Sequence, residues 1–312
     1  MNEFDYIEKC FKPLTSHIAM GLKDDAAIFK QKLNHDLIIS TDTLAEGIHF
    51  FGHENPKDIA KKCLRVNLSD MAAMGAKPIF YNLSVSLPKN KAKYFIPKFA
   101  KGLHEDQEFF GLKLIGGDLT SGLNDINITI TIFGETLNQK SVSRSGAKPG
   151  DLLFVSGVLG LSKIGLDNFY SSSKVFSSAK KKYLIPQPRV ELGLTLNKIA
   201  NSMIDISDGL IQDAHHLAKN SNLSIVLDID KIPLPYIKNL KKDCLLDAAL
   251  YGGDDYELLF SCKPAYEKIL KKISIEKNIE ITKVGFFQKF NKKYINYQNA
   301  KSVLNQNSFL HF

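Results

Sequence analysis

Short runs of β-forming residues alternate along this chain with longer segments of helical period. The clearest run is INITITIFGE, residues 126–135, where apolar side chains occupy every second position, as in a strand with one buried face. Over residues 56–74 the apolar positions instead recur three and four residues apart, which predicts a helix. The mixture of the two periods indicates an α/β or α+β fold.

The same criteria place further elements. Strands are predicted over residues 37–40, 78–88 and 256–262, and a helix over residues 91–111. Residues 112–122 are predicted to form a short strand that enters a glycine loop. Residues 170–189 are rich in Ser, Lys and Pro, so we expect a long surface loop or a mobile segment there.

A strand, a turn and a helix are predicted within residues 202–218. Asp208 is well placed to cap the N-terminus of this helix. Four apolar residues share the face of the helix that should be buried: Leu210, Ala214, Leu217 and Ala218.

A length of 312 residues suggests two domains or one large one. The segment SGAKPGD, residues 145–151, is a cluster of turn-forming residues. We therefore predict an N-terminal domain over residues 1–145 and a C-terminal α/β domain over residues 146–312.

The net charge of +8 comes from lysines that are scattered along the chain. Scattered charge is typical of solvated surfaces and argues against a nucleic-acid or membrane partner. The four cysteines form no CxxC pair, and we expect them to be buried in a reducing compartment. The acidic start and the absence of a long apolar run predict a cytoplasmic protein.

Aspartates recur in short segments where strands are predicted to end. In LIISTDTL, residues 37–44, Ser40 and Thr41 add hydroxyl oxygens next to Asp42. A single aspartate in such a place is usually a turn former. Two carboxylates about 4 Å apart, however, repel by about 4 kcal/mol at an effective dielectric constant of 20. If these segments meet in space, hard oxygen donors of this kind would hold Mg²⁺ or Ca²⁺.

The usual signatures of ATP and dinucleotide binding are absent. The chain has no Gly-Lys dipeptide, hence no Walker A loop, and no GxGxxG. Seven segments nevertheless resemble, in the same order, the motifs of the thiamine-monophosphate kinases: GLKDDAAIF, STDTLAEGIHF, NLSDMAAMGAKP, LIGGDLTSG, SRSGAKPGDLLFVSG, MIDISDGL and GGDDYELLF. The resemblance runs from about residue 21 to residue 261, and SFLHF at the C-terminus is similar to the family's closing aromatic segment.

This resemblance implies a two-domain, synthetase-type ATP-binding fold. The N-terminal mixed sheet would pair across a homodimer, and the C-terminal α/β domain would complete the substrate site. The implied reaction is direct in-line transfer of a phosphoryl group from ATP to thiamine monophosphate. It would require several Mg²⁺ ions and give thiamine diphosphate, as the last step of its biosynthesis.

The resemblance also implies roles for individual residues. The Mg²⁺ ligands would be Asp25, Ser40, Thr41, Asp42, Asp70, Asp118, Asp205 and Asp208, of which Asp42, Asp118 and Asp208 would be catalytic. The nucleotide would contact Gly117, Asp118, Arg144 and Ser207. Thiamine monophosphate would face His49, Asp254 and Phe309.

The acceptor explains why no general base stands out. A phosphate monoester has a second pKa near about 6 and is already an anionic nucleophile at neutral pH. Catalysis would then rest on positioning and on neutralising charge. We expect Glu46 to be solvated and His215 and His216 to point to different sides of their helix, so none of the three is counted as a metal ligand.

Three positions depart from the family motifs. Lys23 stands where the family has glycine, Leu119 where it has threonine, and Asp254 where it has glutamate. The first change falls in a metal loop, and the last shortens a substrate contact by one methylene.

Other readings are less well supported. A selenophosphate synthetase would carry a reactive Cys in a glycine-rich segment, and Cys10 has no such neighbours. An aminoimidazole ribonucleotide synthetase would lack the STDTL…GIHF block. A non-catalytic nucleotide- or nucleic-acid-binding protein is supported only by the net charge, and so many carboxylates would repel phosphate.

Overall fold

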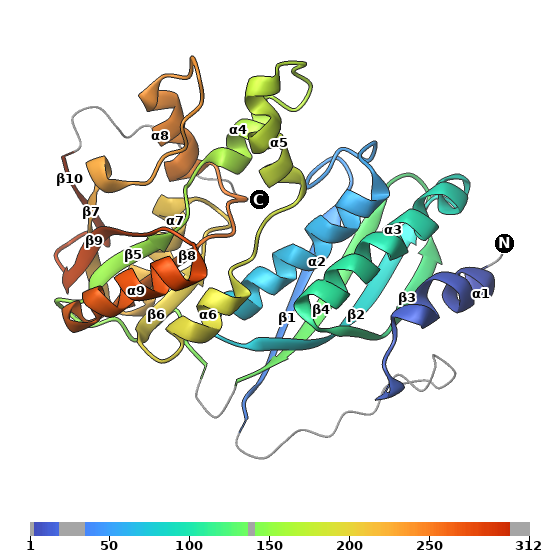
Figure 1. The fold of residues 1–312 in the computed structure, drawn as a ribbon, viewed down its shortest axis with the longest axis horizontal. Coiled ribbons are helices and arrows are strands. Elements are labelled where there is room, and N and C mark those ends of the chain that lie inside the picture. Colours follow the sequence, from blue (N-terminus) through green and yellow to red (C-terminus); the bar gives the residue numbers. More distant parts are fainter. Residues whose placement is uncertain (1–2, 19–34, 137–140, 300–312) are drawn as a thin grey trace. The chain divides into compact units, whose positions relative to one another are not determined.

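The computed structural model describes residues 3–18, 35–136 and 141–299 (Figure 1). The chain divides into two compact units. The first comprises residues Met1–Met71 and Ala76–Lys140, and the second comprises Ala72–Gly75 and Ser141–Phe312. Each unit combines helices with one sheet, so the mixed α/β architecture predicted from the sequence is confirmed.

A four-stranded sheet forms the centre of the first unit. Its strands are β1 (Leu37–Ala45), β4 (Asn127–Glu135), β2 (Lys77–Leu87) and β3 (Lys113–Ser121), in the order β1-β4-β2-β3. Strand β4 is antiparallel to β1 and to β2, whereas β2 and β3 are parallel. The N-terminal segment adds the short helix α1 (Glu3–Tyr6), followed by the helical turns Ile7–Phe11 and Lys12–Leu14.

Two long helices, α2 (Pro56–Ala73) and α3 (Lys89–Phe110), cover one face of this sheet (Figure 1). Along β4, the buried residues Ile128, Ile130 and Ile132 alternate with partly exposed threonines, as expected of a strand with one buried face. Arg65 joins the helices, because its guanidinium donates to both oxygens of the buried Asp106 at 2.6 and 2.9 Å.

In two strands of this sheet, β1 and β3, the polar motif lies within the paired part of the strand and not beyond its end. Strand β1 continues to Ala45, so Ser40, Thr41 and Asp42 are paired within the sheet rather than placed past a strand end. Likewise the GGD motif lies inside β3, where Asp118 pairs with Ser84 of β2. The polar residues were read as a loop signal, but pairing with neighbouring strands outweighs local preference.

The second unit contains a six-stranded sheet in the order β10-β7-β9-β5-β8-β6. The strands are β5 (Leu152–Ser156), β6 (Ala200–Asp205), β7 (Leu223–Asp228), β8 (Leu258–Cys262), β9 (Ile281–Lys289) and β10 (Ile295–Gln298). The helices are α4 (Leu161–Asp167), α5 (Ser177–Leu184), α6 (Val190–Leu196), α7 (Leu210–Asn220), α8 (Lys242–Tyr251) and α9 (Glu267–Lys277).

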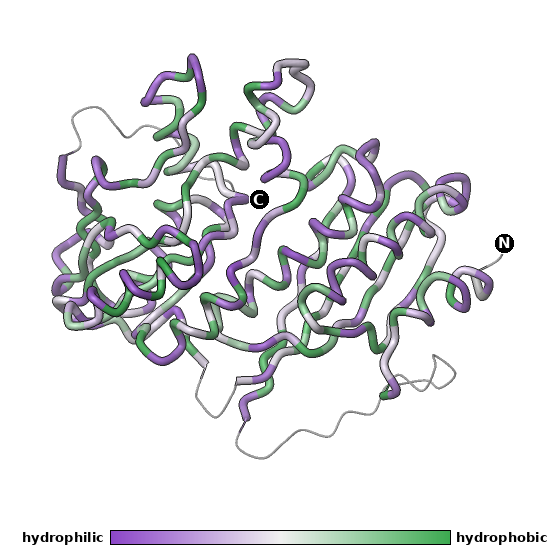
Figure 2. Tube along the Cα trace, viewed as in Figure 1, coloured by the Kyte–Doolittle hydropathy of each residue, from purple (hydrophilic) through white to green (hydrophobic). Residues whose placement is uncertain are grey.

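The strands β5 and β8 of the second sheet are buried on both faces. On one face, Leu153 and Val155 of β5 join a cluster with Leu210 and Leu217 of α7. Phe154, which points to the other face, stacks on Phe260 with ring centroids 5.7 Å apart. Strands buried on both sides read as continuous apolar runs, which is visible as the green stretches of this sheet in Figure 2. The four residues predicted to form the buried face of α7 are all fully buried.

The prediction of a long surface loop or mobile segment over residues 170–189 is wrong. Residues Ser177–Leu184 form helix α5, with Ala179 and Tyr183 buried. Lys182 and Arg189 both bind the buried carboxylate of Glu257, Lys182 at 2.9 Å. A contact with a residue so distant in the sequence leaves no local signal.

The cysteines only partly follow the prediction. Cys63 and Cys262 are buried, Cys10 is half-buried and Cys244 is exposed. Among the described residues, no helix has the length and apolarity needed to cross a membrane.

Candidate active site

In the first unit, three of the predicted metal ligands come together between β1 and α2. The Ser40 hydroxyl donates to Oδ2 of Asp70, on α2, at 2.5 Å. Asp42 lies two residues after Ser40 and therefore on the same face of β1. Burial raises the pKa of the Cys63 thiol of α2, and the Asp42 carboxylate contributes to this rise. Asp42 and Asp70 thus present hard oxygen donors on one side of the sheet.

Thr41 points the other way. Its hydroxyl donates to the Thr131 hydroxyl of β4 at 2.9 Å, and the Thr43 and Thr129 hydroxyls are 2.8 Å apart in the same manner. These pairs lie on the face that α2 and α3 leave open. The Thr41 side chain is therefore not brought together with those of Ser40 and Asp42.

Gly117 and Asp118 lie on β3, at the opposite edge of the sheet from β1. A Cβ atom at Gly117 would lie 1.9 Å from the carbonyl oxygen of Leu83, so only glycine allows β3 to approach β2 this closely. Asp118 is exposed. Within this unit the structure does not bring Asp118 next to Asp42, because β4 and β2 separate their strands.

His49 lies in a loop that buried and half-buried groups hold in place. Its Nδ1 accepts the N–H of Ala45 at 3.0 Å, and its carbonyl oxygen accepts from Lys62 at 3.0 Å. A ring nitrogen that accepts a hydrogen bond carries no proton, so neutral His49 has its proton on Nε2. The imidazole therefore has a defined tautomer and orientation.

The expectation that Glu46 is solvated is wrong. Its carboxylate accepts from Lys91 at 2.6 and 2.8 Å and from the N–H of Ile126 at 2.9 Å. Glu54 similarly accepts from the N–H groups of Phe51 and Gly52, both at 2.7 Å. Glu46 and Glu54 therefore shape the loop of His49 and are not counted as metal ligands.

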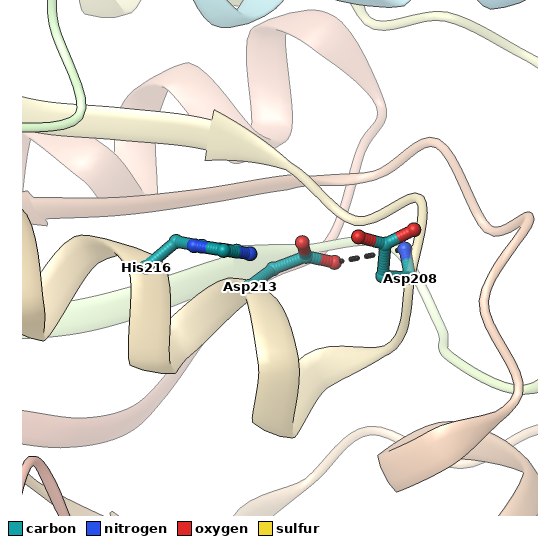
Figure 3. Close-up of side chains that lie close together, drawn as sticks. All are labelled: Asp208, Asp213 and His216. Carbon is teal, nitrogen blue, oxygen red and sulfur yellow. Dashed lines mark hydrogen bonds between the residues drawn. The ribbon is translucent and has the colours of Figure 1, made fainter. Parts of the chain in front are cut away.

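In the second unit, the motif MIDISDGL joins the end of β6 to the start of α7. The prediction that Asp208 caps α7 is wrong, because the carboxylate that accepts the loop amides belongs to Asp213. Its Oδ2 accepts the N–H groups of Ser207 and Asp208, each at 3.1 Å. The bond from Asp208 is drawn in Figure 3. Asp208 instead accepts from Gln212 at 2.9 Å.

Asp213 is a candidate functional residue that the sequence reasoning missed, and His216, which that reasoning did not count as a metal ligand, lies near it. The potential ligand atoms of Asp208, Asp213 and His216 lie within 4.8 Å of one another, in line along α7 and the loop before it (Figure 3). Burial raises the pKa of Asp213 well above its ordinary value, and the carboxylates of Asp205 and Asp208 raise it further. The sequence signal that could have identified Asp213 is its position as an acidic residue in the first turn of the predicted helix.

The pKa of His216 indicates that Arg144 lies near the group formed by Asp208, Asp213 and His216. Burial lowers the pKa of His216, and the positive charge of Arg144 lowers it further. His215 turns elsewhere, with its ring edge against Tyr294 at a centroid distance of 5.2 Å. The two adjacent histidines thus point in different directions, as predicted.

The loop of Asp254 is joined to the loop of Ser207 by backbone hydrogen bonds. The Asp254 N–H donates to the Ser207 carbonyl and the Tyr256 N–H to the Ile206 carbonyl, both at 2.8 Å. The Tyr256 hydroxyl donates to Oδ1 of Asp254 at 2.9 Å. A predicted substrate residue and a predicted nucleotide residue therefore belong to one connected piece of backbone.

The carboxylates of each unit fit Mg²⁺ in kind, since each set consists of oxygen donors without a thiolate. Asp42, Asp70 and Asp118 belong to the first unit, and Asp205 and Asp208 to the second. Asp25 and Phe309, predicted to bind metal and thiamine monophosphate, lie outside the described residues, as does Lys23.

Comparisons with known proteins agree with this arrangement of motifs. Two family models match the chain: AIR synthase related protein, N-terminal domain, over residues 23–136, and AIR synthase related protein, C-terminal domain, over residues 148–295. A thiamine-monophosphate kinase of Buchnera aphidicola subsp. Schizaphis graminum is 39% identical, over 100% of this chain and 99% of that protein.

The chain belongs to the thiamine-monophosphate kinase family. Among solved structures, the thiamine-monophosphate kinase of Stenotrophomonas maltophilia K279a has a TM-score of 0.82 and 32% identity, covering 88% of this chain and 89% of that one. A structure titled AaThiL complexed with AMPPCP and TMP has a TM-score of 0.80 and 29% identity, covering 99% and 97%. Membership of the thiamine-monophosphate kinase family makes the chain a kinase.

Proposed function

We propose that this chain phosphorylates thiamine monophosphate with ATP, giving thiamine diphosphate and ADP. The observation that carries the proposal is the similarity to thiamine-monophosphate kinases along the whole chain, 39% over 100% of its residues for the Buchnera protein. The solved relative in complex with AMPPCP and TMP supports the pair of substrates. We include in the proposal a cytoplasmic location and the absence of a nucleic-acid partner, as expected from the sequence.

We propose Mg²⁺ as the cofactor, held by the carboxylates of Asp25, Asp42, Asp70, Asp118, Asp205 and Asp208, with oxygens of Ser40 and Thr41. The Ser40–Asp70 hydrogen bond and the position of Asp42 on the same face of β1 support this assignment for the first unit. Since the Thr41 side chain is directed to Thr131, Thr41 would contribute its main-chain oxygen. Bound Mg²⁺ would neutralise phosphate charge in the transition state.

For the nucleotide we propose Gly117, Asp118, Arg144 and Ser207. Arg144 offers a planar, always charged guanidinium that suits phosphate oxygens. Its exposure, and its effect on the pKa of His216, which lies beside Asp208, support this role. For thiamine monophosphate we propose His49, Asp254 and Phe309. The His49 tautomer leaves Nε2–H as its donor, which suits an anionic acceptor.

The acceptor phosphate requires orientation rather than deprotonation. With a second pKa near about 6, it is already a nucleophile at neutral pH. The residues of this chain would hold it in line with the γ-phosphate of ATP and offset the charge of both groups. We propose direct transfer, and isolation of a labelled aspartyl-phosphate during turnover would contradict it.

We also propose a homodimer formed through the first sheet. Strand β1 is an edge strand, and Ile39 on its open face is 55% exposed. Ile39 pairs with Phe133, which pairs with Phe80, so an apolar row crosses this face. Within residues 3–18, 35–136 and 141–299 no helix of the first unit covers this face, and an exposed apolar row of this kind is typical of an interaction surface.

The experiment that tests the proposed reaction is product analysis. The purified chain is incubated with ATP, Mg²⁺ and thiamine monophosphate, and the products are separated by chromatography. We expect thiamine diphosphate and ADP in equal amounts, and neither with EDTA. The Asp42→Asn variant should lose most activity, because it removes one charged ligand from the proposed metal site. Mg²⁺-dependent ATP binding without any thiamine diphosphate would show that the acceptor is a different molecule.

A further inference from the structure

We propose that Asp213 is a positioning residue, which holds the loop of Asp205, Ser207 and Asp208 in the shape that Mg²⁺ and nucleotide binding require. The inference rests on the function proposed above, in which these three loop residues bind the metal and the nucleotide. Asp213 lies outside the motif MIDISDGL, so the resemblance to the family implies no role for it.

The geometry of the Asp213 carboxylate carries the proposal. Asp213 is only 1% exposed, and its Oδ2 accepts from two consecutive amides, those of Ser207 and Asp208, each at 3.1 Å. One buried oxygen therefore fixes the orientation of two adjacent peptide planes. This orientation also sets the direction in which the side chains of Ser207 and Asp208 leave the backbone.

The opposite side of the same peptides is also held. The carbonyl of Ser207 accepts from Asp254 and that of Ile206 accepts from Tyr256, both at 2.8 Å. Asp213 thus supplies the second set of restraints, on the N–H side of the loop. A loop restrained on both sides is pre-organised for its ligands, which lowers the free energy lost on binding.

The same bonds determine how Ser207 would meet the nucleotide. Loops before a helix often bind phosphate through main-chain N–H groups. Here the N–H groups of Ser207 and Asp208 already donate to Asp213. The nucleotide would therefore be bound through the Ser207 hydroxyl, and Asp213 would act through the loop rather than by touching the nucleotide.

The experiment compares four variants with the wild type, one of which, Asp208→Asn, is the reference for loss of a proposed metal ligand. Asp213→Ala removes the acceptor, whereas Asp213→Asn keeps an oxygen that can accept both amides but removes the charge. Asp151→Asn is the matched control. Asp151 is 3% exposed, and its Oδ2 also accepts two N–H donors, Lys148 at 2.8 Å and Asn201 at 2.7 Å, but it belongs to no proposed site.

Two readouts separate a positioning role from a general loss of stability. One is hydrogen exchange of the peptide spanning residues 206–209, measured by mass spectrometry. The other is the Mg²⁺ concentration that gives half-maximal binding of AMPPCP. Neither needs thiamine monophosphate, so a failure of the proposed reaction in the wild type would leave both measurements interpretable.

We expect Asp213→Ala to speed exchange in this peptide and to raise the Mg²⁺ midpoint by about 10- to 100-fold, as is typical when a partner of a metal ligand is removed. Asp213→Asn should stay close to the wild type in both readouts. Asp151→Asn should leave the Mg²⁺ midpoint unchanged, even where it lowers the melting temperature.

Two results would overturn the proposal. If Asp213→Ala exchanged faster but kept the wild-type Mg²⁺ midpoint, the shape of the loop would not matter for binding. If Asp213→Asn raised the midpoint as much as Asp208→Asn does, Asp213 would be a metal ligand itself, as its proximity to Asp208 and His216 also allows. This second comparison remains decisive if the alanine variant does not fold.

Discussion

At the scale of single residues, the loop of Asp254 has an unusual backbone conformation. Asp254 and Tyr256 have positive φ angles of 58° and 51°, which are unfavourable for a bulky side chain such as tyrosine. Backbone bonds to Ile206 and Ser207 hold them there. Non-glycine residues in this region are concentrated at functional sites. Asp254 is also one methylene shorter than the family's glutamate, so its placement depends strongly on this backbone.

We expect Tyr256→Phe to weaken binding of thiamine monophosphate. The change removes the hydrogen bond from the Tyr256 hydroxyl to Asp254, worth about 1 kcal/mol. KM for thiamine monophosphate should rise several-fold, with little change in kcat or in KM for ATP, as steady-state kinetics would measure. Tyr170→Phe, at a residue that is 74% exposed, is the control. An unchanged KM for thiamine monophosphate would show that Asp254 needs no support from Tyr256.

At the scale of elements, Glu257, directly before β8, anchors α5 and the segment after it. Its carboxylate is 1% exposed and accepts from Ser156 at 2.6 Å, from Lys182 at 2.9 Å and from Arg189 at 2.6 and 2.7 Å. Burial opposes ionisation, but Lys182 and Arg189 outweigh it and lower the pKa of Glu257. Residues 170–185 therefore include a helix that is attached to the sheet.

We expect Glu257→Gln to destabilise the second unit by roughly 3–5 kcal/mol at neutral pH, because it leaves two half-buried cations, Lys182 and Arg189, without their buried counter-charge. Since the folded pKa is lowered, this stabilisation is present above the ordinary value of 4.5 and is lost as the pH falls through the folded pKa. The difference between wild type and variant in urea unfolding should therefore shrink below about pH 4.5.

Glu105→Gln provides the comparison for this prediction. Glu105 binds Lys57 and Lys61 at 2.7 and 2.8 Å, but its side chain is 34% exposed. An exposed ion pair contributes at most about 1 kcal/mol. An equal loss of stability in the two variants would contradict the anchoring role of Glu257.

At the scale of the whole molecule, the open face of the first sheet predicts the oligomeric state. We expect the wild type to be a dimer in light scattering and Ile39→Lys to be a monomer, because a charge would be buried without a partner in the proposed interface. Ile275→Lys, at a residue of α9 that is 80% exposed, should remain dimeric. A monomeric wild type would contradict the proposed dimer, and a dimer that tolerates lysine at residue 39 would place the interface elsewhere.

Features that depend on neighbours in the sequence could be predicted. Alternation of apolar residues predicted β4, and helical spacing predicted α2, α3 and the buried face of α7. The order of the motifs predicted the family, because each motif is a contiguous segment. The division into domains at residue 145 and the roles of the individual site residues stay predictions.

Features that depend on contacts between distant residues could not be predicted. Glu46 is bound by Lys91, 45 residues away, and α5 by Glu257, 75 residues from Lys182. Asp213 was missed for a different reason: it lies only six and five residues after Ser207 and Asp208, but the local sequence does not show which of the nearby carboxylates accepts their amides. Periodicity indicates which face of an element is buried, but not which residues that face contacts. For a buried charge, the partner determines whether it anchors a loop, binds a ligand or destabilises the fold.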